Sequence, residues 1–354
     1  MNKSIYKICS LVLAIAFAAT AWAGNPDRQG EAGAPELLMN PWARSAGLHT
    51  MTTSMITGVE AMRLNIAGLA RINKTEVILA NTQYLKGTDI QFNAIGLAQK
   101  IGANSALGLS LMSVDFGDIP VTTENQPEGT GAFFRPRFFN IGIGFSHIFE
   151  NKVTVGVLVR AVSESIEDVS ANAIALDAGV QYVTGEQENF KFGISLRNVG
   201  GKMQFQGVGL GQSIVIPNFD GSRDLTINNR ATPYELQSVL NIGMSYDFYV
   251  GGDNRITAVG NYTSNAFSED QIGAGIEFSF KELAMLRAGY KFDFSEFKNS
   301  SVDQDPLYTG LAVGATVNVP VSKKEGAPRF AIDYAYRTTK IYDGTHNFSV
   351  RISL

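Results

Sequence analysis

Two neighbouring stretches decide the fold: FFNIGIGFS at residues 138–146 and KVTVGVLVR at residues 152–160. In each stretch, large apolar residues occupy the odd positions from 139 and from 153 onward. The even positions between them hold mostly glycine or polar residues. Side chains in a β-strand point alternately to opposite faces. This period of two therefore predicts two strands, each with one apolar face.

The same period continues from residue 73 to the last residue, for example in FKFGISLRN (190–198), LNIGMSYDF (240–248) and HNFSVRISL (346–354). No segment of this region keeps a helical period over three turns. We expect fourteen antiparallel strands. Their predicted ranges are 73–85, 88–102, 105–116, 138–149, 152–164, 171–184, 190–199, 234–249, 255–264, 269–281, 284–294, 307–319, 328–339 and 345–354.

The connections between these strands fall into two classes. Every second one is short, as in GANS (102–105) and KE (281–282), whereas the long ones, 117–137, 200–233 and 295–306, all belong to the other set. Outer-membrane barrels have short periplasmic turns and longer extracellular loops. The connections thus favour an all-β, fourteen-stranded transmembrane barrel over a soluble sandwich. An even strand count lets the last strand close against the first.

The two faces of the predicted strands have the composition that such a barrel needs. One face is aliphatic, with aromatic residues near the strand ends, and suits lipid. The other holds Gly, Ser, Asn and Gln. It also carries the charged residues Arg160, Asp177, Arg197, Asp247, Glu277, Arg287, Asp333, Arg337 and Arg351. A selective pore usually shows a ring of one sign. Both signs occur here, which favours an internal salt-bridge network over a pore lining.

The beginning of the chain, MNKSIYKICSLVLAIAFAATAWAG, reads as a signal peptide. Two lysines precede a short apolar core, and Ala21-Trp22-Ala23 predicts cleavage before Gly24. The apolar core is too short for a membrane anchor. We therefore expect export and insertion into the outer membrane. The chain has one cysteine, Cys9, so the mature protein contains neither a disulfide nor a cysteine-ligated metal.

Charge gives no indication of a nucleic-acid partner. Without the two lysines of the signal peptide, 27 basic residues remain against 33 acidic ones, a formal charge of −6. Binding to a phosphate backbone requires the opposite sign. The expected surroundings are instead the lipid bilayer and other proteins.

Residues 24–72 do not alternate and precede the first predicted strand. Fourteen strands enclose a lumen wider than that of an eight-stranded barrel, which side chains fill unaided. We expect this segment to form a hatch inside the barrel. The predicted organisation is a signal peptide at 1–23, a hatch at 24–72 and the barrel at 73–354.

Two short stretches of the hatch, ARSAG (43–47) and EAMRLNIAGLA (60–70), resemble the PorV/PorQ family, which belongs to the fold group of the FadL outer-membrane transporters. The matching positions are Arg44 and Gly47 in the first element and Asn65, Ala67, Gly68 and Leu69 in the second. Leu48 and His49 replace the expected Met-Gly, and Ile66 stands where the family usually has proline. With the signal peptide and the fourteen strands, the resemblance covers the whole mature chain.

This resemblance implies a non-enzymatic component of type IX protein secretion. Such a barrel docks beside a translocon or an attachment complex and receives secreted proteins by their C-terminal domain. The alternative is a FadL-like channel that takes up hydrophobic small molecules. A continuous apolar path through the lumen favours uptake, whereas a lumen blocked by the hatch and by charges favours docking.

The sequence offers no enzymatic or metal chemistry. Its three histidines, His49, His147 and His346, fall in different elements without metal-ligand spacing. No nucleophile elbow or catalytic triad is present, and GVGLGQ (207–212) lacks the lysine of a phosphate-binding loop. We expect no catalytic residue, no cofactor and no metal.

Two of the long connections carry residues suited to binding a partner. Aromatic residues and arginine are enriched at protein–protein hot spots, and the first loop contains Phe133, Phe134, Arg135 and Arg137. The second loop contains the apolar run around Ile214 and Ile216. Exposed apolar stretches indicate a partner. The alternative is that this second loop folds back over the lumen as a lid.

Overall fold

The computed structural model describes residues 24–354, apart from 151, 219–220, 298–306, 308, 323–325 and 340–341. The predicted signal peptide and part of the predicted connection 295–306 lie outside the described residues. In the part of the chain that the structure describes, no helix is long and apolar enough to cross a membrane.

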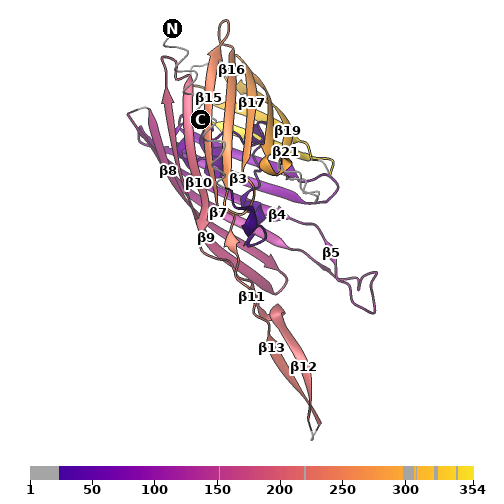
Figure 1. Ribbon diagram of the computed structural model, residues 1–354. Coiled ribbons are helices and arrows are strands. Elements are labelled where there is room, and N and C mark those ends of the chain that lie inside the picture. The colour runs from indigo at the N-terminus through magenta and orange to yellow at the C-terminus, as the bar shows by residue number, and fades with distance from the viewer. Residues whose placement is uncertain are drawn as a thin grey trace.

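Fourteen antiparallel strands form one closed barrel (Figure 1), as the alternation predicted. Each strand pairs with the next along the chain, and β21 returns to pair with β2, from Glu76 opposite Ser353 to Gln83 opposite His346. The barrel strands are β2 (Thr75–Gln83), β3 (Gln91–Ile101), β4 (Ser105–Asp115), β7 (Arg137–Phe149), β8 (Val153–Ile166), β9 (Val169–Thr184), β10 (Phe190–Gly200), β15 (Val239–Tyr249), β16 (Arg255–Asn265), β17 (Gln271–Phe280), β18 (Ala284–Asp293), β19 (Gly310–Pro320), β20 (Arg329–Arg337) and β21 (Thr345–Ser353).

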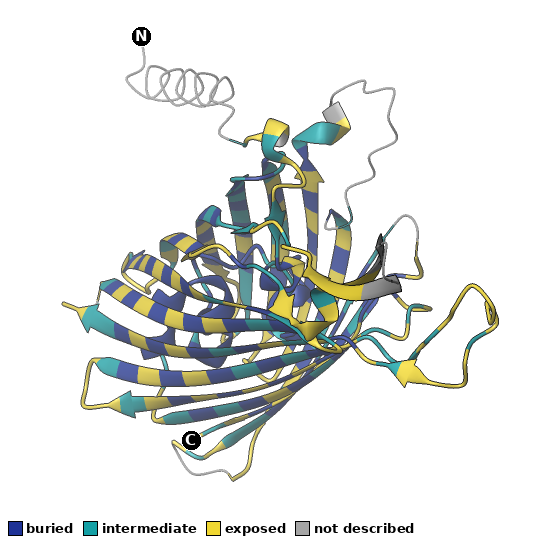
Figure 2. Cartoon of the chain, turned by 90° about the horizontal axis from the view of Figure 1, so that it is seen from below, coloured by how far each residue is buried: buried dark blue, intermediate teal, exposed yellow. Residues whose placement is uncertain are grey.

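Burial follows the predicted alternation along the strands, visible as stripes in Figure 2. In β8, Val155, Val157 and Val159 are exposed on the outer face, whereas Thr154 and Arg160 are buried on the inner face. A soluble protein would hide the valines. Here the exposed face is the apolar one, as expected where the outer surface meets lipid.

The two ends of the barrel differ in their connections. At one end, called the inner end, the turns are short, such as 102–104 between β3 and β4. At the other, the outer end, the connection after β4 contains β5 (Ile119–Pro120) and β6 (Phe133–Phe134). The connection after β10 contains β11 (Gln206–Gly207), η5 (Val208–Leu210), β12 (Gly211–Asn218), β13 (Gly221–Asn228) and β14 (Glu235–Leu236). η6 (Phe294–Phe297) follows β18. The β12–β13 hairpin projects far beyond the barrel (Figure 1).

The N-terminal segment runs through the barrel from the outer end to the inner end. Its β1 (Ala32–Gly33) pairs in parallel with β14 at the outer end, and the chain enters β2 at the inner end. Between them lie only short helices: η2 (Pro35–Leu37), α2 (Ala43–Ala46), η3 (Gly58–Glu60), α3 (Ala61–Leu64) and η4 (Ile66–Ala70), with η1 (Pro26–Arg28) preceding β1.

Glycines on the inner face of the wall let this segment approach closely. A Cβ on Gly156 of β8 would lie 2.7 Å from the backbone carbon and oxygen of Ile66. On the opposite wall, a Cβ on Gly314 of β19 would lie 2.8 Å from Cα of Gly47. The glycines of the polar parity therefore mark where backbone packs on backbone.

An apolar cluster fixes the segment to one side of the wall. Trp42, Val59, Met62 and Leu69 of the segment pack with buried side chains of β2, β3 and β4, among them Phe92. Burial of large side chains such as these contributes about 1.5–3 kcal/mol each. The segment thus packs against this side of the barrel, and the remaining space in the lumen lies along β10 and β15–β21.

Candidate functional site

The lumen contains two cavities on either side of the stretch Leu48–Ile56. The outer cavity has a volume of about 540 Å³ and is lined by His49, Thr50 and Thr53 from this stretch. The inner cavity has a volume of about 430 Å³ and is lined by Leu48, Thr52 and Ile56. One short piece of chain therefore separates a space at the outer end from a space at the inner end.

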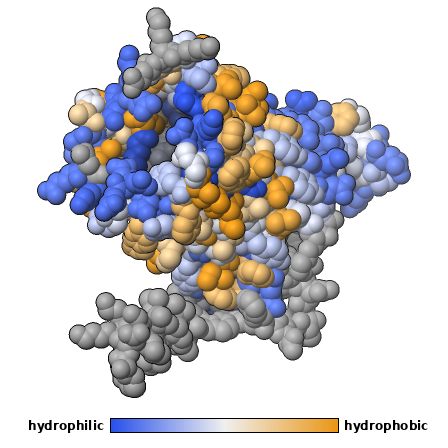
Figure 3. Space-filling model, turned by 90° about the horizontal axis from the view of Figure 1, so that it is seen from above, coloured by the Kyte–Doolittle hydropathy of each residue, from blue (hydrophilic) through white to orange (hydrophobic). Residues whose placement is uncertain are grey.

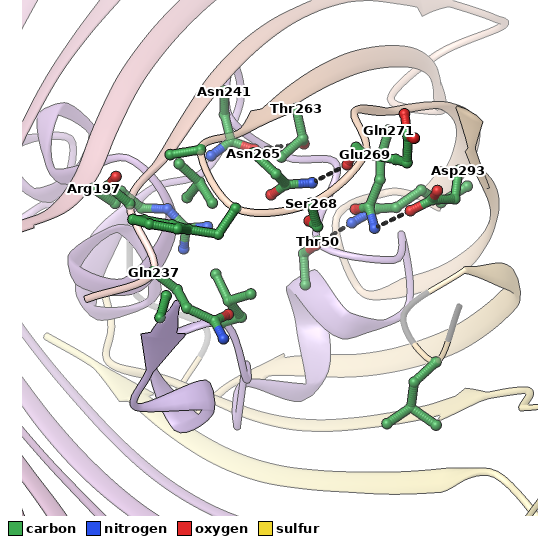
Figure 4. Close-up of a pocket in the computed structure, with 18 of the residues that line it drawn as sticks. Thr50, Arg197, Gln237, Asn241, Thr263, Asn265, Ser268, Glu269, Gln271 and Asp293 are labelled. Carbon is green, nitrogen blue, oxygen red and sulfur yellow. Dashed lines mark hydrogen bonds between the residues drawn. The ribbon is translucent and has the colours of Figure 1, made fainter. Parts of the chain in front are cut away.

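The outer cavity combines apolar and cationic walls (Figure 4). Apolar side chains come from the N-terminal segment, from the start of β15 and from the outer connections: Leu38, Leu64, Val239, Phe267 and Leu307. Arg197 of β10 and Lys291 of β18 both line the space, together with the polar side chains of Asn241, Thr263 and Asn265. The volume lies within the usual range of small-molecule sites, roughly 300–1,000 Å³.

Arg197 and Lys291 have few protein partners. Arg197 donates a hydrogen bond to the backbone oxygen of Arg63, and Lys291 Nζ donates to Thr50 Oγ1 at 3.3 Å. Neither forms a salt bridge within 4.0 Å among the described residues. Asp293 also lines the space, but its carboxylate accepts from Gln271 and Ser295. Two buried cations thus face the cavity without a bound carboxylate, as an anion site requires.

A strained turn carries the dividing stretch past Lys291. His49 and Thr50 adopt left-handed backbone conformations, with φ of 51° and 65°. Burial and the positive charges of Lys291 and Arg337 hold the pKa of His49 well below its usual range. The imidazole is therefore neutral at physiological pH and adds no positive charge to the outer cavity.

The inner cavity is lined by charges that pair with one another. Arg255 binds Asp247 at 3.3 Å and Glu277 at 3.1 Å, and Arg287 binds Glu277 at 2.5 Å. Arg351 lies 3.6 Å from Asp333. The charges of the inner cavity thus form a network of both signs, which offers no apolar path to the inner end.

The other predicted lumenal charges lie on the inner face but not all in this network. Arg160 and Asp177 form a separate buried pair at 2.8 Å, and Arg160 also donates to the backbone oxygen of Met62. Arg197 and Arg337 line the outer cavity. The predicted lumenal charges therefore fall into three groups. One group forms the ion-pair network at the inner cavity, the Arg160–Asp177 pair bonds to the N-terminal segment, and the third group lines the outer cavity. Lys291 and Thr50 were not predicted, and neither stands out by sequence spacing.

The residues of the predicted hatch motif anchor the segment. Asn65 accepts from the Ala67 amide and donates to the backbone oxygens of Thr53 and Val180, the latter in the wall strand β9. A Cβ on Gly68 would press on the backbone of Ile56. Leu69 and Ala67 are fully buried, and Gly47 lies against Gly314.

Arg44 joins the hatch to the inner cavity. It donates to the Thr57 oxygen at 2.9 Å and lies 3.5 Å from Glu60, whose carboxylate accepts from the Ser45 amide. Arg44 itself lines the inner cavity. These contacts assign a positioning role within the segment to Arg44.

The predicted partner-binding residues lie in the outer connections. Phe133 is exposed at the β5–β6 hairpin, and Arg137 is exposed at the start of β7. Arg135 forms an ion pair with Asp118 across this hairpin, which lowers the pKa of Asp118. Phe134 is half-buried in β6.

The second partner-binding pair lies in the projecting hairpin. Ile214 of β12 is 40 % exposed, and Ile216 lies in the same strand with its side chain outside the described residues. The hairpin does not fold over the lumen as a lid, because it extends away from the barrel (Figure 1).

A buried carboxyl pair lies beneath the outer end. Glu36 of η2 is fully buried, and burial together with the neighbouring Glu164 carboxylate raises its pKa to about 8. Glu164 accepts from the Tyr234 hydroxyl at 2.5 Å. Arg63 donates to the backbone oxygen of Glu36. In the described part of the chain, no three His, Cys, Asp or Glu side chains are placed to hold a metal ion.

Comparison with known proteins identifies the architecture. No family model and no curated protein sequence matches the chain. Among solved structures, it is similar to the toluene transporter TbuX of Ralstonia pickettii, with a TM-score of 0.55 and 13% identity over 88% of this chain and 97% of that one. The monoaromatic hydrocarbon channel CymD gives 0.54 and 12% over 89% and 96%. A FadL homologue of Pseudomonas aeruginosa gives 0.51 and 11% over 88% and 97%. The chain therefore has the barrel fold of the FadL-type outer-membrane channels.

Proposed function

We propose that this protein is a non-enzymatic outer-membrane barrel that takes small amphipathic molecules from the outside into its lumen. The observation that carries this proposal is the outer cavity, which is lined by apolar side chains and by Arg197 and Lys291, two basic residues that form no salt bridge with any described residue. The similar solved structures include transporters and channels for hydrocarbons, which supports uptake as the class of activity.

The ligand differs from a pure hydrocarbon in our proposal. A hydrocarbon such as toluene forms no hydrogen bond with a buried lysine. An anionic head group accepts such a bond, and the apolar part of the same ligand then packs against Leu64, Phe267 and Leu307. Hydrogen bonds to charged groups are about twice as strong as neutral ones. A small carboxylate with an aliphatic tail fits both kinds of wall.

Passage beyond the outer cavity requires the Leu48–Ile56 stretch to move. This stretch and the inner ion-pair network close the lumen in the described conformation. The left-handed backbone conformations of His49 and Thr50 cost free energy, because neither residue is a glycine. We propose that ligand binding at Thr50 and Lys291 favours a rearranged stretch.

Binding is tested with radiolabelled octanoate and octan-1-ol and with the full mature barrel in lipid nanodiscs, using empty nanodiscs to correct for partitioning. The proposal expects saturable binding of one octanoate, tighter than that of octan-1-ol. Octanoate that partitions equally into loaded and empty nanodiscs overturns it.

Docking in type IX secretion remains a second candidate. It is favoured by exposed residues at the outer end, namely Phe133 and Ile214 in the two hairpins and Arg137 at the start of β7, and by the closed lumen. The proposed partners are a translocon or attachment-complex barrel and secreted proteins recognised by their C-terminal domain. Deletion of residues 211–228 tests it. Secretion of such proteins is expected to stop while octanoate binding remains, and unchanged secretion excludes the β12–β13 hairpin from this role.

A further inference from the structure

The outer cavity carries neutral polar groups beside its cations and its apolar side chains. Elsewhere the molecule keeps apolar and hydrophilic residues in separate areas, as the face shown in Figure 3 illustrates. Asn241 of β15 and Thr263 and Asn265 of β16 are buried on the inner face of the wall and line the cavity. These polar side chains are therefore open to a ligand in the lumen and closed to lipid.

Several of the polar groups have no partner in the protein. The backbone oxygens of Gln237 and Thr53 accept from Asn198 and Asn65, but neither side chain forms a hydrogen bond with any described residue. The side-chain oxygen of Asn241 accepts from the Thr263 hydroxyl at 2.7 Å, whereas its amide nitrogen has no acceptor among the described residues. Figure 4 shows Gln237 and Asn241 around the same space as Thr50 and Ser268.

An alkyl chain is a poor occupant for this part of the cavity. It removes water from an amide or a hydroxyl without supplying a hydrogen bond, which weakens binding about fivefold or more for each group covered. A ligand hydroxyl both donates and accepts, so it can pair with either kind of group. Gln237, Asn241 and Thr53 therefore favour a ligand that carries hydroxyls.

The acid group of the ligand has separate partners. Arg197 and Lys291 line the same cavity, and each donates only one hydrogen bond to the protein, to the Arg63 backbone oxygen and to Thr50 Oγ1. Their other N–H groups suit the oxygens of a carboxylate. The amides and the Thr53 hydroxyl are thus left for another part of the ligand.

We infer that the ligand of the outer cavity is a hydroxylated acid with an apolar tail, such as an alkyl glycoside of a sugar acid. The inference rests on the proposed function and narrows the class of its ligand. The sugar hydroxyls pair with the side chains of Gln237, Asn241 and Thr53. The apolar tail contacts Phe267 and Leu307. A cavity of about 540 Å³ has room for a sugar ring and a short chain.

Competition for the cavity tests this inference, with the full mature barrel in nanodiscs and radiolabelled octanoate as the probe. Three unlabelled competitors are compared below their micellar concentrations, and empty nanodiscs correct for partitioning. Octanoate has the acid and the tail, octyl glucuronide adds the hydroxyls of a sugar ring, and octyl glucoside has the sugar without the acid. We expect octyl glucuronide to compete at least about tenfold more strongly than either of the others, because two or more hydroxyls gain partners.

A double variant identifies the groups that recognise the hydroxyls. Gln237→Leu combined with Thr53→Val removes two polar side chains that bond to no described residue. The ratio of the octyl glucuronide affinity to the octanoate affinity is expected to fall at least about tenfold. The matched control is Gln206→Leu, an exposed glutamine of the same outer connection that does not line the cavity. This control should leave the ratio unchanged.

The outcomes separate this inference from the proposed function. Octanoate that competes as strongly as octyl glucuronide overturns the inference and leaves the uptake of a simple amphipathic acid in place. Octyl glucoside that competes as strongly as octyl glucuronide overturns it as well, and so does a ratio that is unchanged in the double variant. If neither octanoate nor octyl glucuronide binds saturably, the inference fails together with the proposed function.

Discussion

Replacing Lys291 with methionine should separate recognition of the anionic group from recognition of the apolar tail. Methionine keeps most of the volume of the side chain but removes its charge. In the structure, Lys291 Nζ bonds only to Thr50 Oγ1, at 3.3 Å, among the described residues. Its remaining protons therefore face the outer cavity. A hydrogen bond to a charged group contributes about 1.5–3 kcal/mol. At about 1.4 kcal/mol per factor of ten, this corresponds to an affinity loss of about 10-fold to 150-fold for octanoate.

The assay compares octanoate and octan-1-ol in nanodiscs with wild-type and K291M protein. Octan-1-ol should change less than about threefold, because it shares the tail but lacks the charge. The matched control is Lys191→Met, a lysine on the inner face that pairs with Asp247 in the network at the inner end. This variant should bind octanoate like the wild type. Equal losses for both ligands, or an equal loss in K191M, would refute the role of Lys291.

Three further predictions test how the segment is held. Asn65→Ala removes three hydrogen bonds, two of them buried, and should lower the free energy of unfolding by about 3 kcal/mol at about 1 kcal/mol each. Urea unfolding measures this change, and a loss below the error of the assay contradicts the anchor. Gly156→Ala places a Cβ 2.7 Å from the Ile66 backbone and should lower the thermal midpoint, whereas Gly260→Ala, whose Cβ would meet only Met244 at 3.9 Å, should not. Because burial raises the pKa of Glu36 from 4.5 to about 8, the folded state binds the extra proton. Stability should therefore fall as the pH rises from about 4.5 to about 8, by up to about 1.4 kcal/mol per pH unit, and Glu36→Gln should remove this slope in pH-dependent unfolding.

The barrel could be predicted because one physical signal repeats fourteen times. Alternation in stretches such as KVTVGVLVR fixes which face of each strand meets lipid, independently of its neighbours. The sorting of long and short connections then favours a membrane barrel over a soluble sandwich. β21 pairs with β2 because a barrel leaves no open edge. The predicted strand ends differ from the observed ones by at most five residues.

The lumen was harder to predict because its geometry depends on contacts far apart in the chain. The path of the N-terminal segment rests on β1 pairing with β14, about 200 residues away. Two residues of strand carry no periodic signal. Lys291 looked like any polar residue of its strand, since only the approach of Thr50 shows that it faces a cavity.

If the outer cavity binds a small amphipathic ligand, that ligand should accompany the protein when it is purified. The most direct test is native mass spectrometry of the barrel, released in mild detergent from its own outer membrane. We expect one bound molecule of low mass in the wild-type barrel, which is lost in K291M and retained in K191M. A barrel that emerges without any small molecule, accompanied instead by a large translocon barrel or by secreted proteins sharing a C-terminal domain, would contradict it.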